Sequence, residues 1–469
     1  MITFRSLLLS LALLSVSAAA QQPQASQPDA ATDSNTTPLT LFPHPDSARY
    51  LLSGQANIIF QAHPGFHSPY SGTNSLLARG EYKTSLVGTL FMGFKLNPNP
   101  RYETDAIYDE ESAGGRGVSE ALGLAGFTNL DVVRNPSLGP IPYLARAQVH
   151  QTIGLTSAFV DSDRTQFSLA TKVPARRFEL RIGKMGLPDV FDLNNPGTDS
   201  HLQFLNWTVD NNGAWDYAAD TRGYTYAFVT EYDDILWSAR YAIALMPTIA
   251  NGIELQWNLR RASGQNIELE YRKTPLALFL SKDRKGTVRL LAFVNHANMG
   301  DYRDQIKLAL ATHTTPVITG HPLTSSVKYG LGLNFEQELT QDLRLFGRFG
   351  WNEGQHESYA YTEVDQTFEL GCDLAGNRWS RPHDKIGLVA VSNAIKRDHQ
   401  EYLKLGGLGF LLGDGNLNYA REDILETYYT AHNWRGLFTA FDLQLIAHPG
   451  YNQARGPVEM FSVRTHVDF

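Results

Sequence analysis

The sequence has little cysteine, little charge and almost no long apolar runs. It contains one cysteine in 469 residues, so no intramolecular disulfide can form, and stability must come from packing, sheet closure or lipid. Charged residues make up 19% of the chain, below the usual fraction of about a quarter. The 40 basic residues are outnumbered by 48 acidic ones. This acidic balance argues against nucleic acid as a partner, because such binders normally carry a basic surface.

One extended apolar run lies at the start of the sequence, where residues 1–20 follow the pattern of a secretory signal peptide. The apolar stretch Leu7–Val16 precedes small residues at Ala18–Ala20, as before a cleavage site. It is too short for a transmembrane helix, which needs about 20 apolar residues. Residues 21–48 are rich in Gln, Pro, Ser and Thr, which predicts a flexible arm. We therefore expect an exported chain whose folded domain covers residues 49–469.

Sequence motifs of common enzymes are also missing. No GxSxG, HExxH or Walker A motif occurs, and no GxGxxG opens a helix after a strand. We therefore expect no catalytic residue and no cofactor. One alternative concerns Asp109, Glu110 and Glu111, which lie close to Gly114 and Gly115. This acidic segment is either a solvated loop or a Ca²⁺ site built from carboxylate oxygens.

The chain does contain many segments in which apolar and polar residues alternate. In VKYGLGLNFEQEL (residues 327–339), every second residue from Val327 to Phe335 is apolar or aromatic. A period of two predicts strands with one apolar and one polar face. Several segments are about 10–13 residues long, which suits a tilted membrane crossing. About sixteen such segments lie near residues 55–62, 83–96, 102–111, 142–155, 176–187, 224–233, 235–247, 265–273, 286–299, 327–339, 343–354, 366–374, 385–395, 422–434, 436–449 and 459–469.

The ends of these segments also follow a membrane pattern. Trp237, Trp351 and Trp434 lie at segment ends, as in the aromatic girdles of outer-membrane barrels, and short connections alternate with long ones. The final residues FSVRTHVDF place apolar side chains at alternate positions back from Phe469, which resembles the signal read by the outer-membrane assembly machinery. The prediction is an all-β fold: a transmembrane antiparallel β-barrel of about sixteen strands, with short periplasmic turns and longer extracellular loops.

In such a barrel the apolar faces point to lipid and the charged faces point inward. A barrel of this size leaves an aqueous channel. We therefore predict a water-filled pore lined by arginines, among them Arg146, Arg181 and Arg240. The other inward-facing charged residues expected on the wall are Arg272, Arg344, Arg348, Arg464, Glu179, Glu268, Glu270 and Asp442.

Four stretches of the sequence are QFLNWTVDNNGAWDYAADTRGYTYAFV, MPTIANGIELQWNLRRASGQNIELEYR, LGGLGFLLGDGNLNYARED and HPGYNQARGPVEMFSVRTHVDF. Together they resemble the carbohydrate-selective porins of the OprB family. The resemblance implies a sixteen-stranded outer-membrane barrel whose loops fold inward to narrow a sugar-selective pore. It also implies passive diffusion without nucleotide or cofactor. The loops at 97–141, 300–326 and 355–365 do not match motif by motif, which leaves the identity of the sugar open.

Two stretches have the residue types that a sugar needs. Sugar hydroxyls pair with amides, carboxylates and guanidinium groups, and an aromatic ring supports the apolar C–H face. The first candidate set is Trp207, Trp215, Asp216, Asp220 and Arg222, and the second is Trp257, Asn258, Arg260 and Arg261. The structural alternative is that Asn211–Gly213 makes a turn, Asp220 pairs with Arg222, and the Trp rings pack a loop against the wall. If Arg260 and Arg261 lie on a strand, only one of them can face inward.

The expected function is passive diffusion of mono- and small oligosaccharides across the outer membrane. One alternative is a general or organic-acid porin, and a less favoured one is a receptor or adhesin that uses the barrel as an anchor. The expected partners are small carbohydrates, outer-membrane lipid and the barrel assembly machinery, the last through the Phe469 strand. The apolar strands do not distinguish a monomer from a homotrimer.

Overall fold

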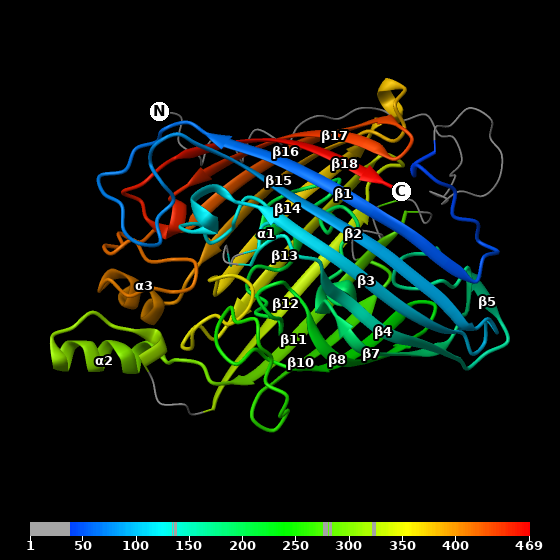
Figure 1. The fold of residues 1–469 in the computed structure, drawn as a ribbon, viewed down its shortest axis with the longest axis horizontal. Helices are drawn as coiled ribbons and strands as arrows, with labels where there is room; N and C mark the ends of the chain where they lie inside the picture. The colour runs from blue at the N-terminus through cyan, green and yellow to red at the C-terminus, as the bar shows by residue number, and fades with distance from the viewer. Residues whose placement is uncertain (1–37, 134, 136–137, 275–279, 281–283, 321–324) are drawn as a thin grey trace. The chain divides into compact units, whose positions relative to one another are not determined.

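A closed antiparallel barrel of sixteen strands forms the folded domain (Figure 1). The computed structural model describes residues 38–133, 135, 138–274, 280, 284–320 and 325–469. The expected signal peptide at 1–20, and the arm up to residue 37, lie outside the described residues. The barrel strands are β1 (Tyr50–His63), β2 (Glu81–Asn97), β3 (Thr104–Gly115), β4 (Tyr143–Gly154), β7 (Arg177–Met185), β8 (Thr225–Asp233), β9 (Trp237–Ala244), β10 (Ser263–Tyr271), β11 (Gly286–Ala297), β12 (Ser326–Glu338), β13 (Leu343–Asn352), β14 (Gln366–Ala375), β15 (Lys385–Ala394), β16 (Glu422–Trp434), β17 (Leu437–Ala447) and β18 (Val458–Asp468).

Each predicted segment became one strand of this barrel, and the first and last strands pair to close it. The period of two is visible in β18, where Phe461 and Val463 are exposed on the outside while Ser462, Arg464 and His466 are buried inside. The strands run obliquely, as closure of a barrel requires (Figure 1). None of the helices in the described part of the chain has the length and apolarity to span a bilayer.

Long and short connections roughly alternate, as predicted, so the longest loops leave one end of the barrel. This end is called the loop end and the other the turn end. The longest connections at the loop end are 116–142, 186–224, 298–325 and 395–421, whereas β16 and β17 are joined at the turn end by residues 435–436. At the turn end, the connection 155–176 carries a small hairpin of β5 (Phe159–Asp161) and β6 (Lys172–Pro174).

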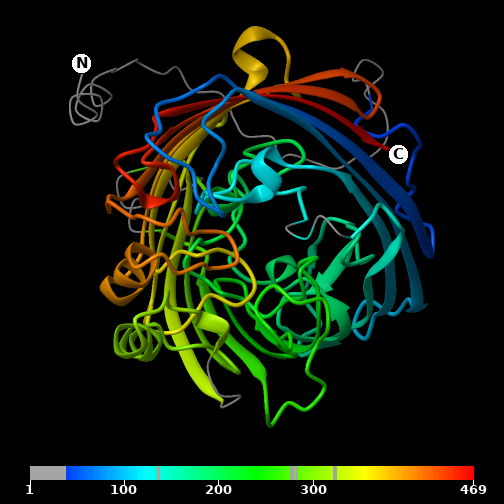
Figure 2. The same cartoon turned by 60° about the vertical axis from the view of Figure 1, so that its left-hand side comes forward.

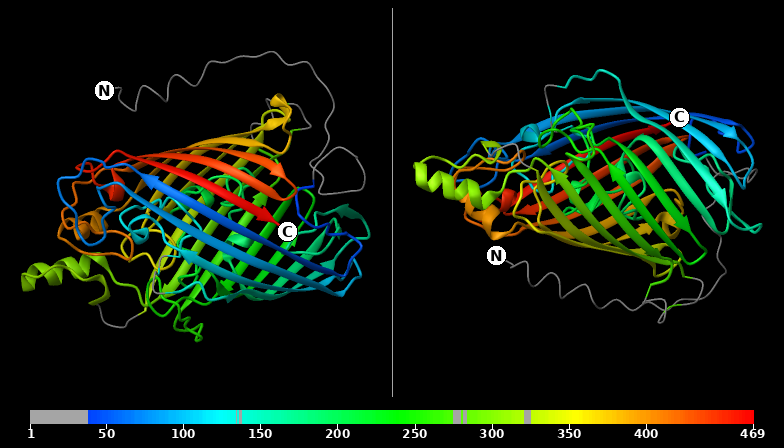
Figure 3. Two further views of the ribbon diagram at one scale, coloured as in Figure 1. Left: turned by 45° about the horizontal axis from the view of Figure 1, so that its top comes forward. Right: turned by 90° about the horizontal axis from the view of Figure 1, so that it is seen from below.

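The described part of the loop end carries three α-helices that the sequence patterns did not predict. They are α1 (Trp207–Asp210), α2 (Tyr302–Thr312) and α3 (Arg397–Lys404). Figure 3 shows α2 beyond the ends of the strands. Its buried side chains, Tyr302, Gln305 and Ala309, are only three, which is too few to give a sustained helical period.

The buried core lies inside the barrel, where connections from the loop end fold inward (Figure 2). Phe191, Phe204 and Trp215 in the connection 186–224 are almost completely buried, as are Leu124 and Phe127 in the connection 116–142. The interior is charged, as predicted, but inward-folded connections occupy much of it. Inward-facing arginines are present, but protein covers most of them.

Candidate functional site

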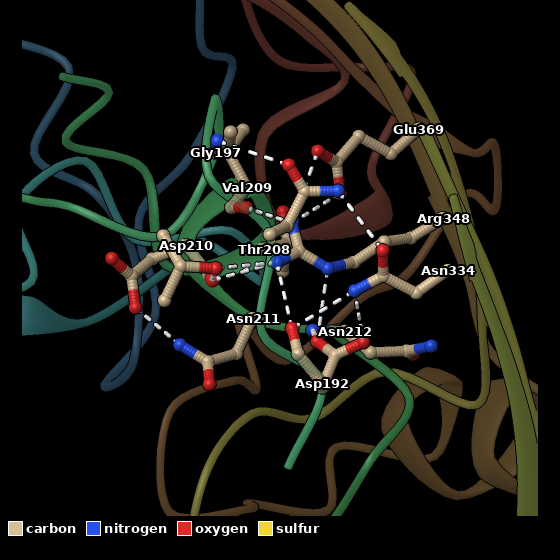
Figure 4. A network of polar contacts seen from close by, with 12 residues as sticks. Asp192, Gly197, Thr208, Val209, Asp210, Asn211, Asn212, Asn334, Arg348 and Glu369 are labelled. Atoms are coloured by element: carbon tan, nitrogen blue, oxygen red, sulfur yellow. Dashed lines mark hydrogen bonds and ion pairs between the residues drawn. The ribbon is translucent and has the colours of Figure 1, made fainter. Parts of the chain in front are cut away.

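The connection 186–224 is fixed to the inner wall by the buried side chain of Arg348 on β13. Its guanidinium donates to the carbonyl oxygens of Val209 (2.6 Å) and Asp210 (3.1 Å). It also forms ion pairs with Asp192 (2.9 Å) and with Glu369 on β14 (3.3 Å). Figure 4 shows this network converging on the guanidinium from loop and wall. Asp192 and Glu369 share this one guanidinium as their cationic partner, and the carboxylate of Asp210 accepts from the side-chain amide of Asn211, so burial of these charges is offset by ion pairs and hydrogen bonds.

The same connection approaches the wall closely at two glycines. The side chain of Asn212 lies against Gly332 of β12 and Gly350 of β13 and donates to the carbonyl of Phe349 at 3.1 Å. A Cβ atom at Gly350 would lie 1.9 Å from Asn212 Oδ1. The turn predicted at Asn211–Gly213 is present, and it is the point where the loop touches the wall.

The inward folding leaves a cavity of about 890 Å³ between this connection and the wall formed by β1 to β4. The lining includes Asn251 and Phe410 from connections of the loop end. It also includes Gln166, in the connection at the turn end, and Asp468 at the end of β18. The cavity therefore extends from residues of one barrel end to residues of the other, off the barrel centre.

Aromatic and charged side chains meet in one part of the lining, called here the arginine–tyrosine cluster. Its members are Glu111, Tyr143, Arg146, Asp189, Arg222 and Tyr224. Two nitrogens of Arg146 each donate to the carboxylate of Asp189 at 2.7 Å, and the guanidinium lies 5.2 Å from the ring centre of Tyr224. The guanidinium of Arg222 lies 3.7 Å from the ring centre of Tyr143, a cation–π distance.

The carboxylate of Glu111 holds the two tyrosines of this cluster. The hydroxyl of Tyr224 donates to it at 3.0 Å, and the hydroxyl of Tyr143 donates to its other oxygen. The cluster thus presents guanidinium donors, carboxylate acceptors and flat rings to one space. These are the groups that neighbouring hydroxyls and the C–H face of a sugar require.

A second group of polar side chains lines the cavity nearer the turn end. His201 of the connection 186–224 pairs with Asp131 of the connection 116–142 at 3.2 Å. The ring of His201 stacks on His466 of β18 with centroids 5.5 Å apart, and Asn57 of β1 donates to Asp131 at 2.6 Å. Burial alone would lower the pKa of His201, but the carboxylate of Asp131 raises it to about 9. The pair links two inward-folded connections to each other.

Only some residues of the first predicted stretch line the cavity. Trp207, Asp220 and Arg222 line the cavity. Trp215 is 1% exposed, does not line the cavity, and donates through Nε1 to Asn266 at 2.9 Å. Asp216 is buried outside the lining, where it forms an ion pair with a lysine and accepts backbone hydrogen bonds from the connection 353–365. Asp220 caps the backbone amides of Arg222 and Tyr224 and forms no ion pair with Arg222.

The second predicted stretch lies outside the cavity. Trp257, Asn258, Arg260 and Arg261 form an exposed turn before β10 and do not line the cavity. Because the turn precedes the strand, the expected alternation of Arg260 and Arg261 across a wall does not apply.

The three wall arginines are divided as well. Arg146 lines the cavity, but Arg181 and Arg240 do not. Arg181 is paired with Glu179 and Glu231, and Arg240 with Glu231, Glu268 and Glu270. The prediction of an arginine-lined pore is not confirmed: among the described lining residues, the arginines are Arg146 and Arg222.

The acidic segment considered for Ca²⁺ lies within β3. Asp109 pairs with Arg146, and Glu111 accepts from the two tyrosines. The described residues contain no group of three or more His, Cys, Asp or Glu side chains placed to hold a metal ion.

Sequence analysis missed Tyr143, Asp189, Tyr224 and the His201–Asp131 pair. Tyr224 was inside the first stretch but was assigned to the wall. The other residues are scattered over two connections and one strand end, and no local pattern brings them together.

The family model described as carbohydrate-selective porin, OprB family, matches residues 108–469. The high-pH structure of OprB from Pseudomonas putida superposes with a TM-score of 0.64 at 16% identity, covering 90% of this chain and 94% of that one. An anion-selective porin from Comamonas acidovorans gives a TM-score of 0.49 at 9% identity, covering 90% and 99%. No curated protein sequence matches this chain.

Proposed function

Because the chain belongs to the carbohydrate-selective porins of the OprB family, we propose that small neutral sugars cross the outer membrane by diffusion along the cavity between β1–β4 and the connection 186–224. The protein is an outer-membrane porin, and its family and fold are those of a channel rather than an enzyme. The observation that carries the route is the cavity itself, whose lining joins residues of both barrel ends.

Arg146, Asp220, Arg222 and Trp207 are the predicted residues that keep a place in this route, together with the rest of the arginine–tyrosine cluster. The guanidinium groups are already bonded to carboxylates or stacked on rings, so they are held in position and contact a passing hydroxyl only weakly. Weak contacts in series suit conduction, because a solute must leave as readily as it enters. Trp215, Asp216, Arg181 and Arg240 are proposed to support the wall and the loop.

The charge of the lining supports neutral sugars over organic acids. Its carboxylates outnumber its cationic groups, which are Arg146, Arg222 and the imidazolium of His201. The carboxylates are Glu111, Asp131, Asp189, Asp199, Asp210, Asp220 and Asp468. Such a lining repels anionic solutes at close range, whereas an organic-acid porin needs an excess of cationic groups along the path.

Three further points belong to the proposal: export directed by residues 1–20, an N-terminal arm at residues 21–48, and recognition of the Phe469 strand by the assembly machinery. Association into homotrimers is proposed as well: exposed apolar side chains of the outer wall, such as Ile182, Leu290 and Phe441, are available to a neighbouring subunit as they are to lipid.

The route is tested by the block of ionic current by sugars in planar bilayers. Arg222→Ala is expected to weaken the block by neutral mono- or disaccharides several-fold. Arg260→Ala is the matched control, because it removes the same group from an exposed turn outside the cavity. Equal block in the two variants would remove Arg222 from the route, and equal conduction of organic acids and sugars would favour the general porin.

A further inference from the structure

The second predicted stretch, which is absent from the sugar route, forms a surface of its own. It belongs to the connection 245–262 and consists of Trp257, Leu259, Arg260 and Arg261, called here the Trp–Arg turn. Figure 1 draws this connection in green, below β8 and β10. Trp257 is 68% exposed and Leu259 is 42% exposed, and large apolar side chains exposed together mark a surface for a partner or a membrane.

The position of Trp257 shows which side of the wall the turn lies on. Its ring centre lies 4.9 Å from that of Tyr226 on β8. Tyr226 alternates along β8 with Ala227 and Val229, which are buried inside, and shares the outer face with exposed Phe228. The Trp–Arg turn therefore folds over the outer face of the barrel at its loop end. It lies at the edge of the apolar surface that meets the hydrocarbon of the membrane.

The arginines of the turn are unpaired with respect to the part of the chain that the structure describes. Neither the Arg260 nor the Arg261 side chain forms an ion pair or hydrogen bond with any described residue. Asn258 fixes the backbone that carries them, because its side-chain oxygen accepts from the amide of Arg260 at 3.1 Å and its carbonyl accepts from the amide of Arg261 at 2.8 Å. Most other arginines on the wall have carboxylate partners, such as Arg272 with Asp233 and Glu270.

We propose that the Trp–Arg turn binds the phosphate groups of an anionic glycolipid in the outer leaflet. Guanidinium groups form forked hydrogen bonds with phosphate, and exposed Trp beside an apolar wall is typical of the membrane–water interface. Arg260 and Arg261 supply the positive charge, while Trp257 and Leu259 supply the apolar contact with the base of the acyl chains. Glu254 is the acidic residue of the same connection, and it forms no ion pair with either arginine among the described residues.

The experiment uses the full-length protein in phosphatidylcholine nanodiscs containing diphosphorylated lipid A at increasing mole fraction. Lipid A retained by the protein is measured by native mass spectrometry. The Arg260→Ala/Arg261→Ala variant is expected to bind lipid A at least tenfold more weakly. The matched control is Arg303→Ala/Lys307→Ala, which removes two exposed cations from α2 that already pair with Asp398 and Asp304, and it should bind as the unaltered protein does.

Two further arms identify the ligand and the depth of the turn. The unaltered protein should bind dephosphorylated lipid A as weakly as the double variant binds diphosphorylated lipid A. Soluble inorganic phosphate should displace lipid A from the unaltered protein only at high phosphate concentration. Lipids brominated near the headgroup should quench part of the tryptophan fluorescence of the unaltered protein. The Trp257→Phe variant should lack a fraction of this quenched fluorescence. Equal retention by the double variant and its control, or binding that does not depend on lipid phosphate, would overturn the proposal. Sugar conduction is expected to be unchanged in these variants, so this result and the sugar route stand or fall separately.

Discussion

The pairing of His201 with Asp131 makes a quantitative prediction. The ordinary pKa of histidine is 6.5, and the Asp131 carboxylate, acting against burial, raises that of His201 to about 9. Because one pKa unit corresponds to about 1.4 kcal/mol, the folded protein prefers the imidazolium by about 3 kcal/mol more than the unfolded chain does. A raised pKa stabilises the folded state fully below pH 6.5, and this stabilisation is lost as the pH rises through 9.

The perturbation is Asp131→Asn, which keeps the shape of the side chain and removes its charge. The pKa of His201 should fall from about 9 to its ordinary value or below, because burial and the neighbouring Arg464 then act without the main opposing charge. Asp468→Asn is the control, since Asp468 pairs with His466 and not with His201. That variant should leave the pKa of His201 near 9.

The assay is an NMR titration of the histidine ring resonances in detergent micelles, with His201→Gln used to assign the signal. A value near 6.5 for His201 in the unaltered protein would refute the pairing. So would a value that does not change in Asp131→Asn.

Three further predictions follow from the packing inside the barrel. Arg348→Met should lower the free energy of unfolding by about 3–5 kcal/mol, because it leaves two buried carboxylates unpaired; an unchanged unfolding midpoint in heat-modifiability gels would contradict this. Gly350→Val should displace the connection 186–224 and change single-channel conductance, because the new Cβ atom would overlap Asn212. Gly88→Ala should leave the conductance unchanged, because the nearest atom to its new Cβ lies 3.9 Å away. Equal conductance in both variants would refute the close approach. Trp215→Ala should lower the free energy of unfolding by about 3–5 kcal/mol, as for other buried Trp residues. The folded fraction should show unchanged block of the ionic current by sugars. A lost block with normal stability would place Trp215 in the sugar route.

The strands could be predicted from the sequence because each carries its own information. Alternation of apolar and polar residues sets the two faces of a strand. Because lipid lies outside and the interior is polar, the same alternation applies to all sixteen strands. The ends of β16 and β13 were therefore placed within a residue or two. The inward folding of 116–142 and 186–224 could not be predicted in this way. It depends on contacts such as Arg348 with Val209, which join residues 139 positions apart.

The candidate site was predicted in composition more than in position. Trp207 and Arg222 line the cavity, but Trp215, only a few residues away, is buried behind it. Both tryptophans lie in the same aromatic and amide-rich context, so composition cannot separate them. Trp257 and Arg260 have residue types suited to a sugar, but they lie on the outer face of the barrel. There the adjacent apolar wall places them next to membrane lipid, the partner proposed for them.

The route of the solute is tested most directly by closing the cavity reversibly. Ala113 of β3 lines the cavity, and Cys372, the natural cysteine, can be replaced by serine to leave Ala113→Cys as the single thiol. Liposomes containing this variant should admit neutral mono- and disaccharides faster than amino acids of similar size. A bulky reagent that forms a disulfide with the introduced cysteine should stop sugar entry, and a reductant that removes the reagent should restore it. Sugar entry that is no faster than amino-acid entry, or that continues after complete labelling, would contradict a sugar-selective path between β1–β4 and the connection 186–224.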